Sequence, residues 1–124
     1  MIIVLDSGFL IALERRNQKA LAVVDAIEQQ QIPTFVPAGV LAQVWRDSPR
    51  QHAISKLIKS QTVKVVPFDE FTALKVGKLL ADSGTSDLVD AHVAILAQKM
   101  NAIVYTSDIG DISALIPALE LVRI

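Results

Sequence analysis

The chain alternates between short apolar runs and longer segments whose apolar residues recur at helical spacing. Runs rich in Val, Ile, Leu and aromatic residues predict short strands. The other segments predict helices, because residues three or four positions apart share a helix face. The predicted strands are 2–5, 33–37, 62–68, 102–106 and 119–124, and the predicted helices are 7–14, 19–30, 37–45, 48–58, 69–83, 87–100 and 107–116.

Small polar residues, proline and glycine mark where several of these helices begin and end. Pro37 suits the first turn of a helix, and Ser48 followed by Pro49 resembles an N-cap and the first helical position. Asp69 can cap the next helix, and the glycine of the SGTS stretch can end it. These signals support the strand and helix order read from the apolar pattern.

The regular exchange of strand and helix predicts an α/β fold. Parallel strands need a crossover between them, and helices usually supply it. We therefore expect a three-layer α/β/α sandwich with a mostly parallel, Rossmann-like central sheet. No linker, internal repeat or low-complexity stretch divides the 124 residues, so we expect one domain spanning 1–124, a length sufficient to bury roughly two thirds of the unfolded surface.

Composition narrows the chemistry that the domain can support. Hydrophobic residues make up 52% of the chain, but there is no cysteine and there are only two histidines, so disulfides, thiolate zinc sites and histidine-rich metal sites are excluded. Any metal would need oxygen ligands. Asp6 interrupts the apolar opening well before the roughly 20 residues of a membrane span, and no basic leader segment precedes it. We expect no membrane association and a cytoplasmic location.

Charge is unevenly distributed along the chain, although the net charge is only −1. Residues 15–64 carry a balance of +5, and residues 65–124 carry −4. A basic half can bind a polyanion while an acidic half collects cations. Solvated helix faces give the same asymmetry, so the pattern supports this interpretation without deciding it.

Four aspartates occupy positions that an α/β sheet could bring together. Asp6 ends the first predicted strand and Asp108 follows the fourth by two residues, so both belong at the carboxyl edge of the sheet. Asp87 and Asp90 are three residues apart and share a helix face. Two carboxylates about 5 Å apart repel by roughly 3 kcal/mol at an effective dielectric near 20. A bound Mg²⁺ or Mn²⁺ ion would remove that repulsion. Such an ion activates water and holds phosphate oxygens, so the arrangement favours phosphodiester hydrolysis.

Each of these aspartates also has a purely structural interpretation, in which it stabilises the start of a helix and binds no metal. Asp6 and Asp108 each precede a helical segment and could be N-caps, and Asp87 lies where a negative charge favours a helix start. Asp90 lies too far into its helix to cap it. The joint pattern of the four, more than any one of them, favours a functional site.

Four motifs follow one another along the chain: a strand that ends in Asp6, then SGFLIALE, DAHVAILA and YTSDIGDI. Their order and spacing resemble the PIN domain family, of the VapC-like toxin type, and the resemblance covers essentially the whole chain. The resemblance implies an Mg²⁺- or Mn²⁺-dependent endoribonuclease that cuts RNA, is the toxin of a toxin–antitoxin pair, and is held inactive by an antitoxin. It also implies the site residues. Asp6, Asp90 and Asp108 match the metal-binding acids, Asp87 matches an additional acid, and Ser7 and Thr106 match hydroxyl residues flanking the site.

Gln43 departs from the family pattern, which usually has glutamate at that position. Its amide oxygen can ligate a metal or orient water, but one negative charge is lost. Asp47 would share the face of Gln43 only if that helix continued to Ser48, whereas Asp47 more naturally ends the helix near Pro49. The substitution keeps an alternative open: a weakened or inactive PIN-like module that binds RNA or a protein.

Several other residues receive provisional roles. Arg46, Arg50, Lys56 and Lys59 follow Gln43 in the basic half and are candidates for holding the RNA backbone, or are simply solvated positive residues. His92 points off the face of Asp87 and Asp90, which predicts a helix-surface or interface histidine. A homodimer is expected, mainly from the family.

A second alternative is phosphoryl transfer of the kind carried out by haloacid-dehalogenase-like phosphatases and response-regulator receivers. Those proteins also place an aspartate after the first strand. Here Asp6 is followed by Ser7-Gly8-Phe9, which lacks the second aspartate of the phosphatases, and no receiver-like acceptor aspartate ends a middle strand. The residues therefore argue against this chemistry.

Overall fold

A five-stranded, wholly parallel sheet forms the centre of the protein. The computed structural model describes residues 1–124. The strands lie in the order β3-β2-β1-β4-β5, and every neighbouring pair is parallel. The prediction of a parallel α/β sandwich is therefore confirmed. The strand bounds are β1 Ile3–Leu5, β2 Thr34–Pro37, β3 Val63–Val66, β4 Ile103–Thr106 and β5 Glu120–Arg123.

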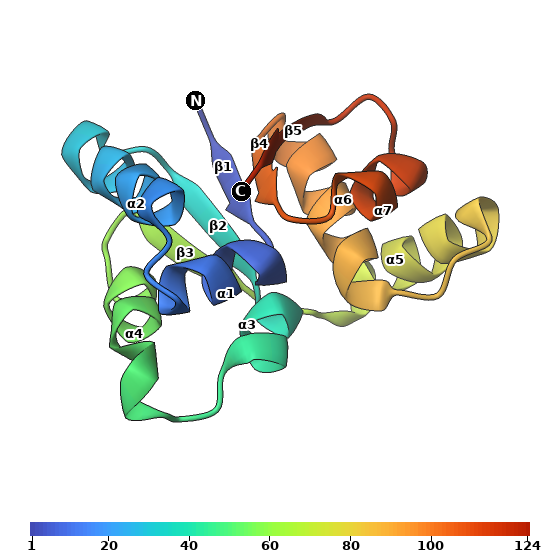
Figure 1. Ribbon diagram of the computed structural model, residues 1–124. Coiled ribbons are helices and arrows are strands. Elements are labelled where there is room, and N and C mark those ends of the chain that lie inside the picture. The colour runs from blue at the N-terminus through green and yellow to red at the C-terminus, as the bar shows by residue number, and fades with distance from the viewer.

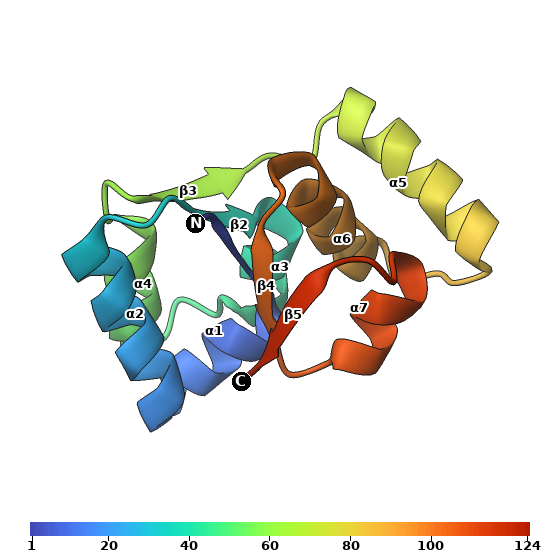
Figure 2. The ribbon, with the colours of Figure 1, turned by 90° about the horizontal axis from the view of Figure 1, so that it is seen from above.

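Helices cover both faces of the sheet (Figures 1 and 2). On one face lie α1, α2 and α4, and on the other α6 packs against the sheet with α5 and α7 outside it. Helix α3 packs against α1 near the end of β2. The helix bounds are α1 Ser7–Glu14, α2 Gln18–Gln30, α3 Ala38–Val44, α4 His52–Ile58, α5 Glu70–Ser83, α6 Leu88–Met100 and α7 Ile109–Leu115, with a 3-10 turn, η1, at Pro49–Gln51.

The core is built around β1, whose three residues are all buried. Helix α1 contributes Phe9 and Leu13 to the core, and α6 contributes Val93 and Leu96. Because β1 is the middle strand and is covered on both faces, its sequence is continuously apolar instead of alternating. A separate small cluster, formed by Val76, Ala91, Ala94 and Leu115, joins α5, α6 and α7.

Most predicted caps are confirmed. Asp69 accepts a hydrogen bond from the Thr72 amide at 2.8 Å, Ser48 accepts one from the Arg50 amide at 3.2 Å, and Gly84 ends α5 with φ of 70°. Helix α3 is shorter than predicted, because it ends at Val44 and Trp45 is extended.

Asp47 does not share a helix face with Gln43. It lies beyond the end of α3 and has φ of 53°, in the left-handed region. The expectation that the helix does not carry Asp47 onto the face of Gln43 is therefore confirmed, although the helix ends earlier than expected, at Val44. No helix in the protein combines the length and the apolar character that spanning a membrane requires.

Gly8 allows the start of α1 to lie directly against the segment after β4. A Cβ atom added at Gly8 would lie 1.9 Å from Ser107 Oγ, 2.8 Å from Ser107 Cβ and 3.1 Å from the Ser107 backbone nitrogen. The Oγ could rotate away, but the Cβ and backbone atoms could not. The absence of a side chain at Gly8 therefore allows the first turn of α1 to pack against Ser107.

We predict that Gly8→Ala lowers the free energy of unfolding by about 1–3 kcal/mol, because a methyl group is forced into a filled space. Gly77→Ala is the matched control: an added Cβ there meets nothing within 4 Å, and alanine in a helix interior is favoured over glycine by up to about 1 kcal/mol. Urea denaturation of both variants measures the difference. Equal stability of Gly8→Ala and the wild type would contradict the close approach.

Candidate active site

Asp6 lies at the end of β1 and is buried, with 4% of its surface exposed. Its Oδ1 accepts a hydrogen bond from the Phe9 amide at 3.0 Å and so caps α1. Burial raises the pKa of Asp6, and hydrogen bonds from Thr106, Phe9 and Gly8 partly oppose that rise. The structural interpretation of Asp6 as an N-cap is confirmed, and the capping contact fixes its carboxylate at the carboxyl edge of the sheet.

Thr106 contacts the backbone of one strand-end aspartate and lies near the other. It is fully buried at the end of β4, and its Oγ1 accepts a hydrogen bond from the Asp108 amide at 2.8 Å. The Thr106 side chain also lowers the pKa of Asp6 and so partly opposes the effect of burial on that pKa. The hydroxyl therefore fixes the backbone at Asp108 and favours the ionised form of Asp6.

Three carboxylates converge where α6 and α7 begin. Asp90, Asp108 and Asp111 each offer a carboxylate oxygen, and these oxygens lie within 4.8 Å of one another. Asp108 occupies the N-cap position of α7 but makes no side-chain capping hydrogen bond, so its carboxylate is free for other contacts. Asp111 was missed by the sequence analysis. Its spacing of three from Asp108, equal to that of Asp87 from Asp90, was the available signal.

The acids in this cluster perturb one another. Desolvation raises the pKa of Asp90 to about 6, and the charges of Asp87, Asp108, Asp6 and Asp111 add to the rise. The pKa of Asp108 is also raised, by desolvation and then by its hydrogen bond with Asp111. A raised carboxylate pKa means that the ionised form is destabilised, which a bound cation would reverse. The donor set, made of carboxylates alone, suits Mg²⁺ or Mn²⁺.

Asp87 caps α6. Its Oδ1 accepts hydrogen bonds from the Val89 and Asp90 amides at 3.0 and 2.9 Å, which confirms the structural interpretation of this residue. It also borders a hollow of about 280 Å³ whose lining includes Asp90 and Asp111. Asp87 therefore contributes charge to the acidic cluster while its nearest contacts are with the helix start.

Gln43 lies on α3 and is joined to α1. The Ser7 hydroxyl donates a hydrogen bond to Gln43 Oε1, and Ser7 directly follows Asp6 in the chain. Gln43 also lines a groove of about 360 Å³ together with Arg15, Arg46 and Arg50. Gln43, at the position where the family usually has glutamate, therefore lines a basic groove.

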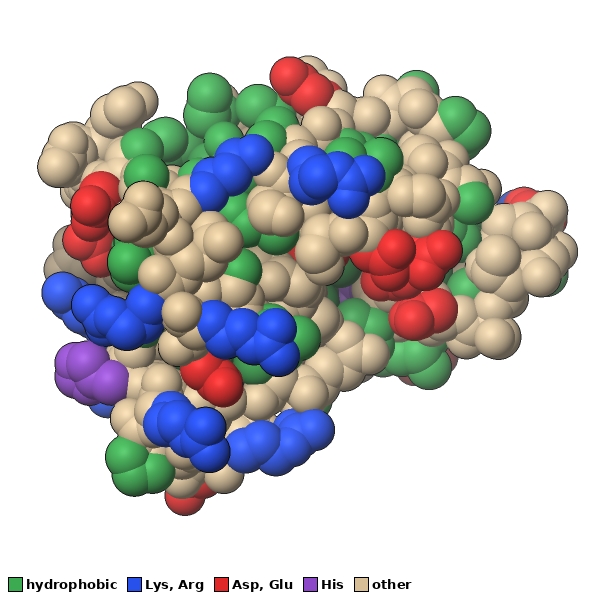
Figure 3. Space-filling view, viewed as in Figure 1, with side chains coloured by type: hydrophobic (Ala, Val, Ile, Leu, Met, Phe, Trp, Pro, Cys, Tyr) green, Lys and Arg blue, Asp and Glu red, His purple; other side chains and the backbone are tan.

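Acidic and basic side chains lie on opposite sides of this end of the molecule. Figure 3 shows Asp and Glu side chains gathered over α6 and α7, and Lys and Arg side chains over α1, α3 and α4. The four predicted RNA contacts divide between two grooves. Arg46 and Arg50 share the groove with Gln43, whereas Lys56 and Lys59 line another with His52 and Glu28.

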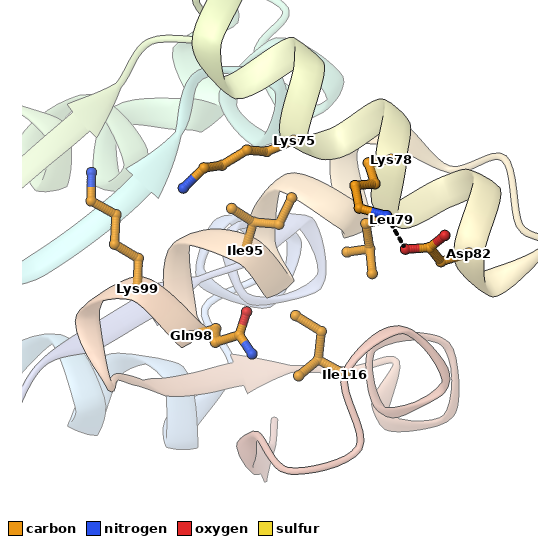
Figure 4. A pocket seen from close by; sticks show the side chains of 8 residues that line it. All are labelled: Lys75, Lys78, Leu79, Asp82, Ile95, Gln98, Lys99 and Ile116. Carbon is orange, nitrogen blue, oxygen red and sulfur yellow. Dashed lines mark hydrogen bonds and ion pairs between the residues drawn. The ribbon is translucent and has the colours of Figure 1, made fainter.

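A hollow of about 420 Å³ between α5 and α6 lies outside this arrangement. Figure 4 shows Lys75 and Lys99 reaching toward the same side of it, and the ion pair of Lys78 with Asp82 at 3.1 Å. Its residues on α6, including Lys99, come from the second half of that helix, whereas Asp90 lies in the first turn. The hollow contains none of the clustered acids.

His92 is buried, with 2% of its surface exposed, so the prediction of a helix-surface histidine is wrong. Its ring packs edge-on against Phe68 with the ring centres 5.3 Å apart. Burial lowers the pKa of His92, and its Nδ1 has no hydrogen-bond partner. The link between β3 and α5 covers this part of α6, which the helix periodicity alone could not reveal.

The sequence profile of the PIN domain family matches residues 3–113. The chain belongs to the PIN domain family. The resemblance noted from the motifs is therefore confirmed.

Solved structures with the same fold support this assignment. VapBC2 from Rickettsia felis, bound to a DNA fragment from its promoter, matches with a TM-score of 0.73 and 17% identity over 99% of this chain and 98% of that one. FitAcB from Neisseria gonorrhoeae matches at 0.62 and 18%, covering 96% and 95%. VapBC-1 from nontypeable Haemophilus influenzae matches at 0.62 and 19%, covering 99% and 98%. None of the curated proteins compared with the chain matches it.

We predict that the metal-free protein loses stability as pH rises from about 4 to about 7. The pKa of Asp90 is near 6 in the folded state and ordinarily 3.8, so the folded protein holds this proton more tightly than the unfolded chain does. The resulting stabilisation is present below pH 3.8 and is lost as pH rises through 6. Urea midpoints in EDTA at pH 4.5, 6 and 7.5 measure the trend.

Asp90→Asn should flatten this dependence and be more stable than the wild type at pH 7.5. Asp25→Asn is the control, because Asp25 is exposed on α2 outside the cluster. An unchanged pH dependence in Asp90→Asn would contradict the raised pKa assigned to Asp90.

Proposed function

We propose that the chain is an Mg²⁺- or Mn²⁺-dependent endoribonuclease, the toxin component of a toxin–antitoxin pair. The observation that carries the proposal is the convergence of Asp90, Asp108 and Asp111 at the carboxyl edge of the sheet, beside the buried Asp6. Membership of the PIN family, whose members are generally nucleases, supports a hydrolase acting on phosphodiester bonds.

Asp90, Asp108 and Asp111 would hold the cation, with Asp6 and Asp87 adding negative charge around it. When bound, such a cation supplies an activated water and neutralises charge on phosphate oxygens. The protein's own contribution is to fix the acids before the substrate arrives. Thr106 fixes the backbone at Asp108, and the cap made by Asp87 fixes the first turn that carries Asp90.

The proposed partners are RNA, an antitoxin and a second copy of the chain. The fold shared with the VapBC and FitAcB structures supports an antitoxin partner. Phe71 and Leu74 on α5 are 63% and 69% exposed, which supports a homodimer that covers them. We also propose that Lys56 and Lys59 contact the backbone of a longer RNA.

A PIN-like module that binds RNA or a protein without cutting is the second candidate. Gln43 favours it, because an amide supplies no charge to a cation. The two candidates differ in whether RNA is hydrolysed when Mn²⁺ is present.

We predict that the purified protein cuts at least one member of a panel of structured RNAs, including tRNAs, in Mn²⁺ or Mg²⁺, and that EDTA stops the reaction. Asp90→Asn should lower the rate more than about 100-fold, because it removes a charged group from the site where charge develops. Gel analysis of the RNA products measures both effects. Asp25→Asn is the control for an acid outside the cluster.

Gln43→Glu separates the two candidates. Cutting by the wild type shows that the amide is compatible with activity. Cutting by Gln43→Glu alone would mean that the site is disarmed at this position, and no cutting by either variant would favour the binding module.

A further inference from the structure

The groove that contains Gln43 carries three arginines without an acidic partner. Arg15 from α1, and Arg46 and Arg50 from the segment after α3, line it, and we call it the arginine groove. Its one carboxylate, Glu14, already accepts a hydrogen bond from Gln51 Nε2 at 2.7 Å. The protein's single ion pair joins other residues, on α5. The three guanidinium groups are therefore free to bind an anion.

Arg46 is held in place before any ligand binds. Its Nη1 donates hydrogen bonds to the Trp45 carbonyl at 2.7 Å and to the Ala42 carbonyl at 3.3 Å. These bonds use one nitrogen of the guanidinium and leave the other donors available. A guanidinium whose orientation is fixed loses less side-chain entropy when it binds a phosphate.

Gln43 completes the groove at the end nearest Asp6. Its Oε1 accepts the Ser7 hydroxyl, which occupies one of the two lone pairs of that oxygen. Both N–H donors of Nε2 have no hydrogen-bond partner, and an amide nitrogen donates hydrogen bonds and cannot ligate a cation. The free donors of Gln43 therefore suit an anion such as phosphate.

We propose that the arginine groove binds the sugar–phosphate backbone of the RNA strand next to the bond that is cut, with Gln43 Nε2 donating to a phosphate oxygen. This inference rests on the proposed nuclease function. Guanidinium groups match phosphate oxygens in paired hydrogen bonds. Only Ile11 and Val44 of the nine lining residues are apolar, whereas a docked amphipathic peptide helix needs a row of apolar contacts. The groove therefore suits a nucleic-acid backbone better than a protein segment.

The test is binding of a fluorescein-labelled single-stranded oligoribonucleotide to the full chain in EDTA, followed by anisotropy between 50 and 200 mM salt. Arg15→Gln and Arg46→Gln should each weaken binding several-fold and lower the salt slope by about 0.7, the value for one phosphate contact on a single strand. Lys75→Gln and Lys99→Gln are the matched controls, because both residues line the hollow between α5 and α6. These controls should keep the wild-type slope.

Gln43→Glu and Gln43→Ala test the assigned role of the amide. In EDTA, Gln43→Glu should weaken RNA binding more than Gln43→Ala does, because a carboxylate repels phosphate. Gln43→Ala should leave the Mn²⁺ affinity, measured by calorimetry, unchanged. A loss of Mn²⁺ affinity in Gln43→Ala would overturn the assignment and make Gln43 a metal ligand.

Three further results would contradict RNA binding by the arginine groove. The first is a wild-type salt slope in both arginine variants, and the second is an equal loss of RNA affinity in the lysine controls. The third is displacement of the RNA by polyglutamate as readily as by unlabelled RNA. Absence of RNA binding by the wild type would also overturn it. If the protein binds RNA without cutting it, the nuclease proposal is rejected and RNA binding by the arginine groove still holds. If the arginine variants cut RNA and bind it normally, only the role of the arginine groove is rejected.

Discussion

Repulsion among carboxylates held at one edge of a parallel sheet is the constraint on which the rest of the site depends. Desolvation and the surrounding acids raise the pKa of Asp90 to about 6. The pKa of Asp108 is also raised. A fold keeps such a cluster only if other contacts stabilise it. The buried β1 and the helices on both sides of the sheet supply that stability, so the acids can remain close together.

Local contacts then set the geometry. Gly8 lets α1 approach the segment after β4, and Thr106 Oγ1 accepts a hydrogen bond from the Asp108 amide. Asp6 and Asp87 each cap a helix while adding charge to the same region. A capping role and a functional role are thus compatible in one residue. The same edge carries opposite charge on its two sides, with acids on α6 and α7 facing arginines on α1 and after α3 (Figure 3).

Much of the fold follows from local sequence, because β1 is continuously apolar and helix caps such as Asp69 and Gly84 act within a few residues. Asp6 and Asp108 could be selected because each follows a predicted strand, and Asp90 because it shares a helix face with Asp87 and matches a PIN family motif. Contacts between distant segments could not be predicted. Asp111 had a local signal, its spacing of three from Asp108, but its convergence with Asp90 depends on the packing of α7 beside α6, and His92 is buried because Phe68, far away in the sequence, covers it.

The central claim is that the acids of α6 and α7 form the cation site. Calorimetric titration of the metal-free protein with Mn²⁺ tests it most directly, with Asp111→Asn as the variant and Asp25→Asn as the control. We predict saturable binding by the wild type and the control, and at least about tenfold weaker binding by Asp111→Asn, because one of the three converging carboxylates is lost. Equal affinity in all three proteins, or no binding by the wild type, would contradict the account.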